Sequence, residues 1–363
     1  STAKTSHDYV SASTACSNRI GHSSMSALPT PPTRQQPSLV GILIAIAGFA
    51  LFAFFINRVG LEDVTEGIVR IGWGFLGILV LSGARFVLRG AAWLRCLPPG
   101  HGLGLRDIVT ASLAGDALGN LTPLSIALGE PVKALYLKDQ APLSNTMPAL
   151  AVETLFYTLS VVVVIAAGGA TLFVLISPPT IEGLVTAVPI VTLAALVIGV
   201  HWLLWKRIPL ASKVLRFVAR LQIASTFVAR IEQYALDIEQ RVHRDYPKDW
   251  SRVTSVAALH LTFHALAIAE IFLVLWLISD QPPTVLDAFV LEAVNRFINV
   301  AFKFVPMRIG VDEAGTAFFS NLLAFGTAAG VTIAIARKGR MLVWTAVGVA
   351  ALIRRGLLLT PFK

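Results

Sequence analysis

Two stretches of this apolar chain place proline, glycine, acidic and basic residues at spacings that could form a ligand site. The first, DALGNLTPLSIALGEPVKALYLK, covers 116–138, and the second, FVPMRIGVDEAGTAFF, covers 304–319. In each stretch a proline is expected to interrupt a helix, and a glycine followed by an acid is expected to begin a new one. Paired, broken and charged segments in the two halves of a membrane protein indicate a transport site. We expect both segments to be re-entrant and related as an inverted repeat.

The glycines and acids at these breaks predict particular ligand chemistry. Backbone N–H groups after Gly129 and Gly310 could hold phosphate oxygens if a half-helix begins at each glycine. We expect the second half of the first segment to begin at Pro131, because proline suits the first turn of a helix. Glu130 and Glu313 at the same helix ends would weaken a simple anion site. They suit binding an ammonium group, carrying a proton or capping the new helix.

Other charged residues lie in or beside the hydrophobic segments, where a charge at a helix centre costs about 2.5–3.5 kcal/mol. Such residues must pair, reach an interface or face a wet cavity, and structural ion pairing is the plain alternative for each. Arginine could instead bind phosphate through two parallel hydrogen bonds. The predicted substrate-binding residues are Arg85, Arg89, Asp116, Asn120, Pro123, Gly129, Glu130, Lys133, Glu153, Asn295, Arg296, Asn299, Lys303, Pro306, Arg308, Gly310, Asp312 and Glu313.

The composition indicates a polytopic membrane protein. The 363 residues are 55% hydrophobic and 14% charged, with a mean hydropathy of +0.72, whereas a soluble chain is about 25% charged. The net charge of +9 fits basic cytoplasmic loops, so we expect anionic or zwitterionic membrane lipids as partners and no nucleic acid. Cys16 and Cys96 form no disulfide or CxxC pattern, and His260 and His264 lack the glutamate of an HExxH zinc site. We therefore expect no cofactor and no metal.

The hydrophobic pattern predicts an all-α fold, a membrane helical bundle of about eight segments. A disordered polar tail (1–38) is expected before a single transmembrane domain (39–358), with a short tail at 359–363. Residues 206–252 carry ten Lys or Arg residues, which predicts a cytoplasmic or interfacial segment of an integral protein of the cell (inner or plasma) membrane. The predicted spans are 39–56, 73–97, the broken segment from 108, 149–176, 183–205, 253–278, 288–305, 316–336 and 341–358, with the basic residues 337–340 as a turn.

The two breaks resemble motifs of the flippase-like transmembrane region of the lysylphosphatidylglycerol synthase superfamily. The first has N-x-x-P followed by G-[GE]-x-x-[RK], here Asn120, Pro123, Gly129, Glu130 and Lys133. The second has P-x-x-x-G-x-x-E, here Pro306, Gly310 and Glu313. The resemblance covers residues 39–358. The superfamily also includes stand-alone relatives associated with hopanoid and polyprenyl-glycolipid pathways. It implies lipid translocation or lipid binding without covalent chemistry.

The chain departs from this family pattern at two places. Thr154 and Tyr157 stand where the family often has an arginine and an aspartate after the glutamate of the fourth segment. Met307 and Arg308 replace small residues after the second proline, and an arginine in that hinge could alter the headgroup preference. The soluble aminoacyl-transferring domain of the full-length synthases is absent from the sequence given, so we expect no synthase activity.

These observations favour a flippase-like protein that binds a polar-headed lipid and moves it between leaflets. The lipid could be a phospholipid, an aminoacylated phospholipid, or a polyprenyl or hopanoid lipid. One alternative is a membrane enzyme that modifies a lipid headgroup, with Asp116, Glu130 or Glu313 as acid–base groups. Another is a membrane scaffold for a lipid-synthesis enzyme, bound through 206–252. We expect the protein not to be an enzyme.

Overall fold

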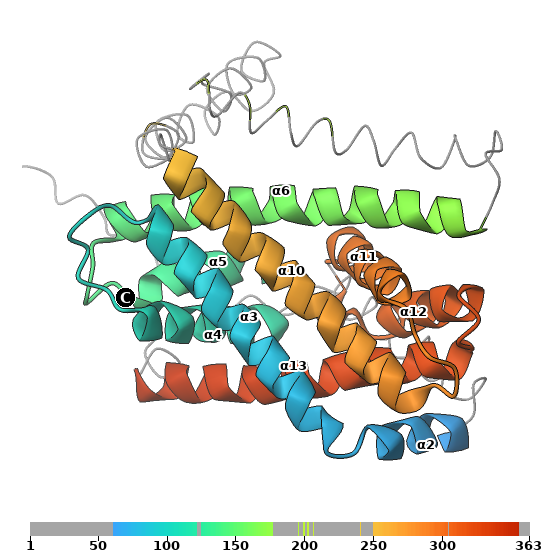
Figure 1. The fold of residues 1–363 in the computed structure, drawn as a ribbon. Helices are drawn as coiled ribbons and strands as arrows, with labels where there is room; N and C mark the ends of the chain where they lie inside the picture. Colours follow the sequence, from blue (N-terminus) through green and yellow to red (C-terminus); the bar gives the residue numbers. More distant parts are fainter. Residues whose placement is uncertain are drawn as a thin grey trace, which may run out of the picture. The chain divides into compact units, whose positions relative to one another are not determined.

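The structure, a computed structural model, describes residues 61–121, 125–176, 250–303 and 305–355, with a few isolated positions between 195 and 240. Within these ranges every regular element is helical, and the predicted all-α fold is confirmed (Figure 1). Several predictions fall outside the described residues: the polar tail 1–38, the first span 39–56, Pro123 and the tail 359–363. Nearly all of the span 183–205 and of the basic segment 206–252 also lies outside them.

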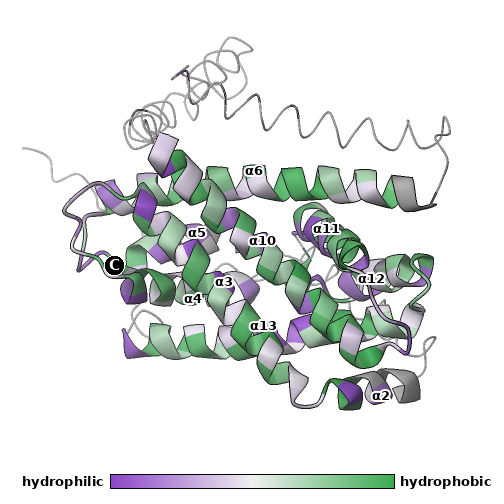
Figure 2. Cartoon of the chain, in the orientation of Figure 1, coloured by the Kyte–Doolittle hydropathy of each residue, from purple (hydrophilic) through white to green (hydrophobic). Residues whose placement is uncertain are grey.

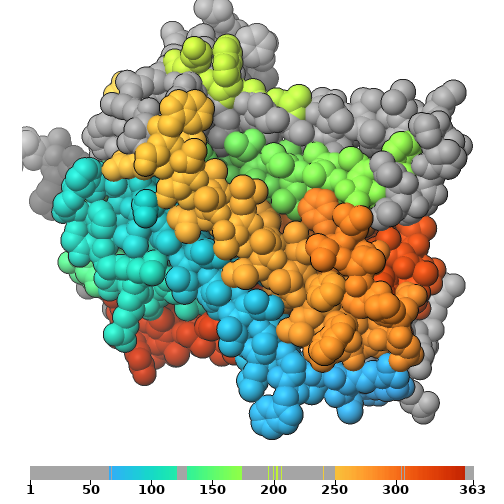
Figure 3. Space-filling view, in the orientation of Figure 1, coloured from blue at the N-terminus to red at the C-terminus, as the bar shows by residue number. Residues whose placement is uncertain are grey.

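Three long helices provide the membrane-length elements. Among the described residues, Gly74–Cys96, Leu143–Phe173 and Trp250–Ile278 are long and apolar enough to cross a membrane. They lie in α3 (Gly74–Cys96), α6 (Leu143–Ile176) and α10 (Trp250–Ile278). At 1.5 Å per residue even α3 is about 34 Å long, enough for a hydrocarbon layer of about 30 Å. Helices α3 and α10 lie side by side on the face shown in Figure 3.

The first predicted break separates α4 (Leu105–Leu121) from α5 (Ser125–Tyr136). The two helices pack against each other, with a close approach between Gly115 and Gly129. The predicted start of α5 at Pro131 was wrong, because the helix begins at Ser125 and includes the proline. Gly129 and Glu130 are therefore inside α5 and do not open it. The predicted anion cradle after Gly129 is accordingly not formed by a helix N-terminus.

The second predicted break separates α11 (Val285–Ala301) from α12 (Val311–Leu322), with the short 3-10 helix η1 (Pro306–Arg308) between them. Here the helix begins after the predicted glycine: Gly310 precedes α12 with φ 84°. Met307 and Arg308 have φ of 49° and 51°, a left-handed conformation that is costly for side chains of this size. The turn is therefore strained at the point where it faces the other helices.

Two segments expected to be loops are helical. The residues after the predicted first span form α2 (Leu61–Ile71), and the predicted basic turn 337–340 lies in the middle of α13 (Thr327–Arg354). Charged positions interrupt the otherwise apolar helices in Figure 2. The prediction at 337–340 was wrong because these basic side chains pair with buried acids, so a charged run did not require a loop.

Helices α13 and α4 approach closely at Gly348. A Cβ at this position would collide with the Leu113 carbonyl oxygen and lie 2.7 Å from the Ala117 Cβ. Replacing Gly348 by alanine is therefore expected to lower the free energy of unfolding by about 1–3 kcal/mol, the usual cost of overpacking.

Denaturant unfolding of the purified protein in detergent would measure this change. The control is Gly129→Ala, since a Cβ at Gly129 would meet its nearest atom at 3.5 Å and alanine favours a helix. Equal stability of the two variants would show that α13 and α4 are not packed this tightly.

Candidate functional site

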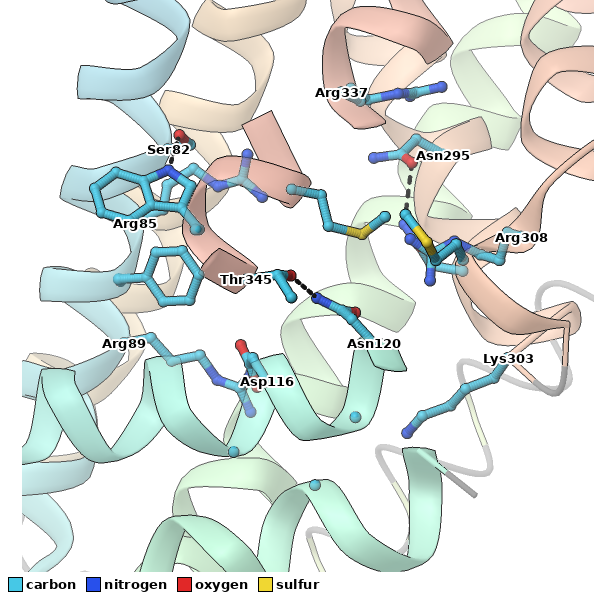
Figure 4. A pocket seen from close by; sticks show the side chains of 18 of the residues that line it. Ser82, Arg85, Arg89, Asp116, Asn120, Asn295, Lys303, Arg308, Arg337 and Thr345 are labelled. Atoms are coloured by element: carbon cyan, nitrogen blue, oxygen red, sulfur yellow. Dashed lines mark hydrogen bonds between the residues drawn. The ribbon is translucent and has the colours of Figure 1, made fainter. Parts of the chain in front are cut away.

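A polar cavity of about 540 Å³ lies among α3, α4, α5, α6, α10, α11, η1, α12 and α13. Figure 4 shows labelled side chains from α3, α4, α11 and α13 pointing into one space. Eight cationic and three acidic side chains line the cavity within the described part of the chain. The cations are Arg85, Arg89, Arg296, Lys303, Arg308, Arg337, Lys338 and Arg340, and the acids are Asp116, Glu130 and Asp312.

One buried glutamate serves two of the cavity arginines. Glu270 on α10 is 2% exposed. Its Oε2 lies 2.8 Å from the Arg85 Nη1 on α3, and its Oε1 lies 2.5 Å from the Arg340 Nε on α13. Glu270 does not line the cavity. It holds both guanidinium groups at the cavity wall from behind while giving them a single negative charge.

Two more glutamates hold one arginine each. Glu153 on α6 accepts two hydrogen bonds from Arg89, at 2.9 and 3.4 Å. Glu292 accepts a 2.5 Å hydrogen bond from the Nε of Arg296, one turn later on α11. Both carboxylates are buried behind the cavity wall. Because a planar guanidinium can bind an acid on one edge, such pairing fixes each arginine while its other edge can face a ligand.

The α4–α5 pair contributes the acids that face the cavity most openly. The Lys133 ammonium is buried and lies 2.8 Å from Asp116 and 2.9 Å from Glu130. Glu130 also lies 3.6 Å from Arg89. About a third of each acidic side chain remains exposed. This wall of the cavity therefore carries accessible carboxylates beside its cations.

The second break contributes a different arrangement. Asp312 accepts a 2.9 Å hydrogen bond from Arg337. Glu313 is fully buried, accepts the Gly310 N–H at 2.7 Å and pairs with Lys338. Of the three roles open to Glu313 in the sequence, this geometry fits capping of the new helix, with the added role of holding Lys338.

Aromatic rings separate three of the cavity arginines. The Arg89 guanidinium lies 4.4 Å from the centre of the Tyr157 ring, and Arg296 donates a 3.0 Å hydrogen bond to the Tyr157 hydroxyl. On the other side, Arg85 and Arg296 lie 4.8 and 5.2 Å from the centre of the Phe263 ring. Cation–π contacts favour this stacking. The rings therefore allow several like charges to line one small volume.

A family comparison covers most of the chain. The family model of the lysylphosphatidylglycerol synthase transmembrane region matches residues 38–348. The chain belongs to this family. The resemblance found in the sequence is thereby confirmed, and with the membrane-length helices it makes the chain an integral membrane protein whose relatives act in lipid biology. Comparison with curated proteins and with solved structures gives no match.

The structure brings together most of the predicted site residues of this lysylphosphatidylglycerol synthase-like chain. Lys133, Glu153 and Glu313 lie behind the cavity wall, and Gly310 and Pro306 belong to the turn before α12. Pro123 is outside the described residues. Those that line the cavity are Arg85, Arg89, Asp116, Asn120, Gly129, Glu130, Asn295, Arg296, Asn299, Lys303, Arg308 and Asp312.

Several residues of the site were missed from the sequence. Arg337, Lys338 and Arg340 were expected to lie in a basic turn at 337–340. The signal that could have found them is the unbroken apolar sequence on both sides, with no proline and no Asn-Gly pair. Glu270 and Glu292 were also missed, although each is a lone acid inside an apolar helix, which membrane insertion disfavours unless the acid is paired.

His260 and His264 are both buried, but only His264 makes a side-chain hydrogen bond among the described residues. His264 lies 3.0 Å from the Ser160 hydroxyl, and His260 lies 3.9 Å from Glu153. The described residues hold no group of three or more His, Cys, Asp or Glu side chains suited to a metal ion. The two histidines therefore pack α10 against α6 next to the site.

Proposed function

We propose that this protein binds the anionic headgroup of a membrane lipid in the cavity and moves that lipid between leaflets. The observation that carries the proposal is the cavity wall, where eight cations face three acids. Five of the cations, four of them arginines, are anchored from behind by buried glutamates that do not line the cavity. Guanidinium groups fixed in this way suit phosphate oxygens, and the family places the chain among proteins of lipid metabolism.

The two breaks support translocation because they contain helices too short to cross a bilayer. Helices α5 and α12 have 12 residues each, about 18 Å at 1.5 Å per residue. We infer that each is half of a re-entrant segment. Irregular backbone at membrane depth is tolerated where it is buried or lines a wet cavity, and the turn at 305–310 borders this one. A headgroup could thus pass through the polar cavity while its tails remain in lipid.

A leaflet-exchange assay tests this function. Purified protein in vesicles should accelerate the exchange of fluorescent phosphatidylglycerol, measured as the fraction accessible to an external quencher. The mass of the lipid should stay unchanged, since an enzyme acting on the headgroup would alter it. Exchange no faster than in protein-free vesicles, across phosphatidylglycerol, phosphatidic acid and polyprenyl phosphate, would contradict the proposal.

A pair of neighbouring substitutions on α13 gives the matched control. Met341 lines the cavity, whereas Leu342 is 55% exposed. Met341→Trp fills the cavity without removing a charge, so leaflet exchange is expected to fall close to that of protein-free vesicles. Leu342→Trp makes the same kind of change outside the cavity and should exchange lipid at the rate of the parent protein. Equal rates in both variants would show that the lipid does not use this cavity.

A further inference from the structure

The cavity and its ion-pair partners carry more positive than negative charge. Among the described residues, the eight lining cations and Lys133 make nine cations. The three lining acids and the buried glutamates 153, 270, 292 and 313 make seven acids. Each acid lies within 4.0 Å of a Lys or Arg group, so each is counted as the partner of one cation. Two positive charges are therefore left without an acid.

The excess is located on one side of the cavity. On the α4–α5 side, Arg89 and Lys133 share Asp116, Glu130 and Glu153, so acids outnumber cations. Elsewhere Glu270 is shared by two arginines. Lys303, which is exposed, and Arg308 have no acid within ion-pair distance in the described ranges. At longer range Lys303 still interacts with the charge of Glu130, and Arg308 with that of Asp312. The uncompensated charge thus surrounds the turn between α11 and α12.

Hydrogen-bond donors in the same region lack acceptors. Four buried nitrogen atoms on three arginines have no hydrogen-bond partner among the described residues. They are Nε of Arg85, Nε of Arg308, and Nε and Nη1 of Arg337. All three side chains line the cavity. Buried donors are nearly always satisfied in folded proteins. Unfilled donors beside excess positive charge indicate an anionic ligand with several acceptor oxygens.

We propose that the preferred ligand is a lipid phosphomonoester, whose headgroup carries close to two negative charges; this rests on the proposed function of the same cavity. A phosphomonoester offers three acceptor oxygens and a charge of about −1.5 to −2 at neutral pH. It would neutralise the two uncompensated cations. A phosphodiester such as phosphatidylglycerol would leave one of these two cations without a counterion, and a zwitterionic headgroup would leave both.

A matched pair of ligands isolates the charge. Farnesyl phosphate and its methyl ester have the same tail and the same phosphorus centre, but the ester carries one negative charge. Binding is measured on the full chain in a neutral detergent, by intrinsic tryptophan fluorescence or native mass spectrometry. Farnesyl phosphate is expected to bind about tenfold more tightly or better, because one further charge pairing outside bulk water is worth at least that factor. Equal affinities would overturn the proposal.

Substitutions of the two unpaired cations then test whether these residues cause the preference for farnesyl phosphate over its methyl ester. Arg308→Gln and, separately, Lys303→Gln each remove one unpaired cation, so each should bring the two affinities close to equal. Arg95→Gln is the control, because Arg95 binds the Ser255 hydroxyl on an exposed surface and does not line the cavity. A preference unchanged in both cavity variants, with the proteins folded, would also overturn the proposal.

The result of this binding experiment can be distinguished from the result of the leaflet-exchange assay that tests the proposed function. If leaflet exchange occurs but the two farnesyl ligands bind equally, the lipid class is wrong and translocation stands. If farnesyl phosphate binds preferentially but no lipid is exchanged, the ligand class stands and translocation is wrong.

Discussion

Replacing Glu270 by glutamine is expected to lower the free energy of unfolding by about 3–5 kcal/mol, the usual cost of breaking a buried ion pair. The carboxylate is 2% exposed and gives a single negative charge to two guanidinium groups, from α3 and α13. Glutamine keeps the shape but removes the only acid within ion-pair distance of Arg85 and Arg340 among the described residues. Denaturant unfolding in detergent measures the loss.

The control is another glutamate with an arginine partner, but in an exposed position. Glu66 pairs with Arg70 at 2.9 Å with 63% of its side chain exposed, so Glu66→Gln should change stability by about 1 kcal/mol or less. A loss below about 1 kcal/mol in Glu270→Gln as well would contradict the idea that buried acids hold the cavity cations. A second check is the double variant Glu292→Gln with Arg296→Gln, which should be more stable than Glu292→Gln alone.

The sequence predicted the fold class and both breaks, because these depend on local rules. Long apolar runs predict helices in a membrane, and prolines interrupt them. The start of α12 after Gly310 was also predicted, since a glycine followed three residues later by an acid suits the N-terminus of a helix. The start of α5 did not follow. Pro131 suits the first turn of a helix, but packing of α5 on α4 retains the helix through the proline.

The misses at the site have a common physical cause. A charged residue in an apolar run can be a loop, a snorkelling side chain or a member of a buried pair, and only the partner distinguishes these cases. Arg337, Lys338 and Arg340 were read as a loop because Asp312, Glu313 and Glu270 lie 25, 25 and 70 positions away in the chain. Pairing over such separations is set by tertiary packing, which periodicity does not reveal.

Tyr157 shows how a departure from a family motif can be compensated. In the family pattern described from the sequence, an aspartate often stands there, and it would supply a negative charge beside Arg89. Here the ring lies under the Arg89 guanidinium and the hydroxyl accepts a hydrogen bond from Arg296. The quadrupole of the Tyr157 ring and its hydroxyl replace the full negative charge of an aspartate. The net charge of the cavity is therefore one unit more positive than it would be with an aspartate at this position. This replacement is consistent with the cation excess on which the proposed ligand class depends.

Replacing the glutamate of each break by alanine is expected to change the free energy of unfolding by different amounts, although the two motifs look alike. Glu313→Ala should lower the free energy of unfolding by about 3–5 kcal/mol. It would leave the Gly310 N–H without its acceptor, and among the described residues Lys338 would keep only Asp312, 3.9 Å away. Glu130→Ala should cost about 1 kcal/mol or less, because Lys133 retains Asp116 and Arg89 retains Glu153.

Parallel unfolding and leaflet-exchange measurements on the two variants would check this difference. Glu130 lines the cavity and Glu313 does not. The Glu130→Ala protein should therefore fold but show an altered rate of lipid exchange. The Glu313→Ala protein should lose lipid exchange in proportion to the fraction of protein that is unfolded. Glu313→Gln separates the two duties of Glu313, because its side-chain oxygen can still accept the Gly310 N–H while the charge facing Lys338 is gone. If Glu313→Ala stays fully stable but stops lipid exchange, then Glu313 acts on the lipid and its capping role is incidental.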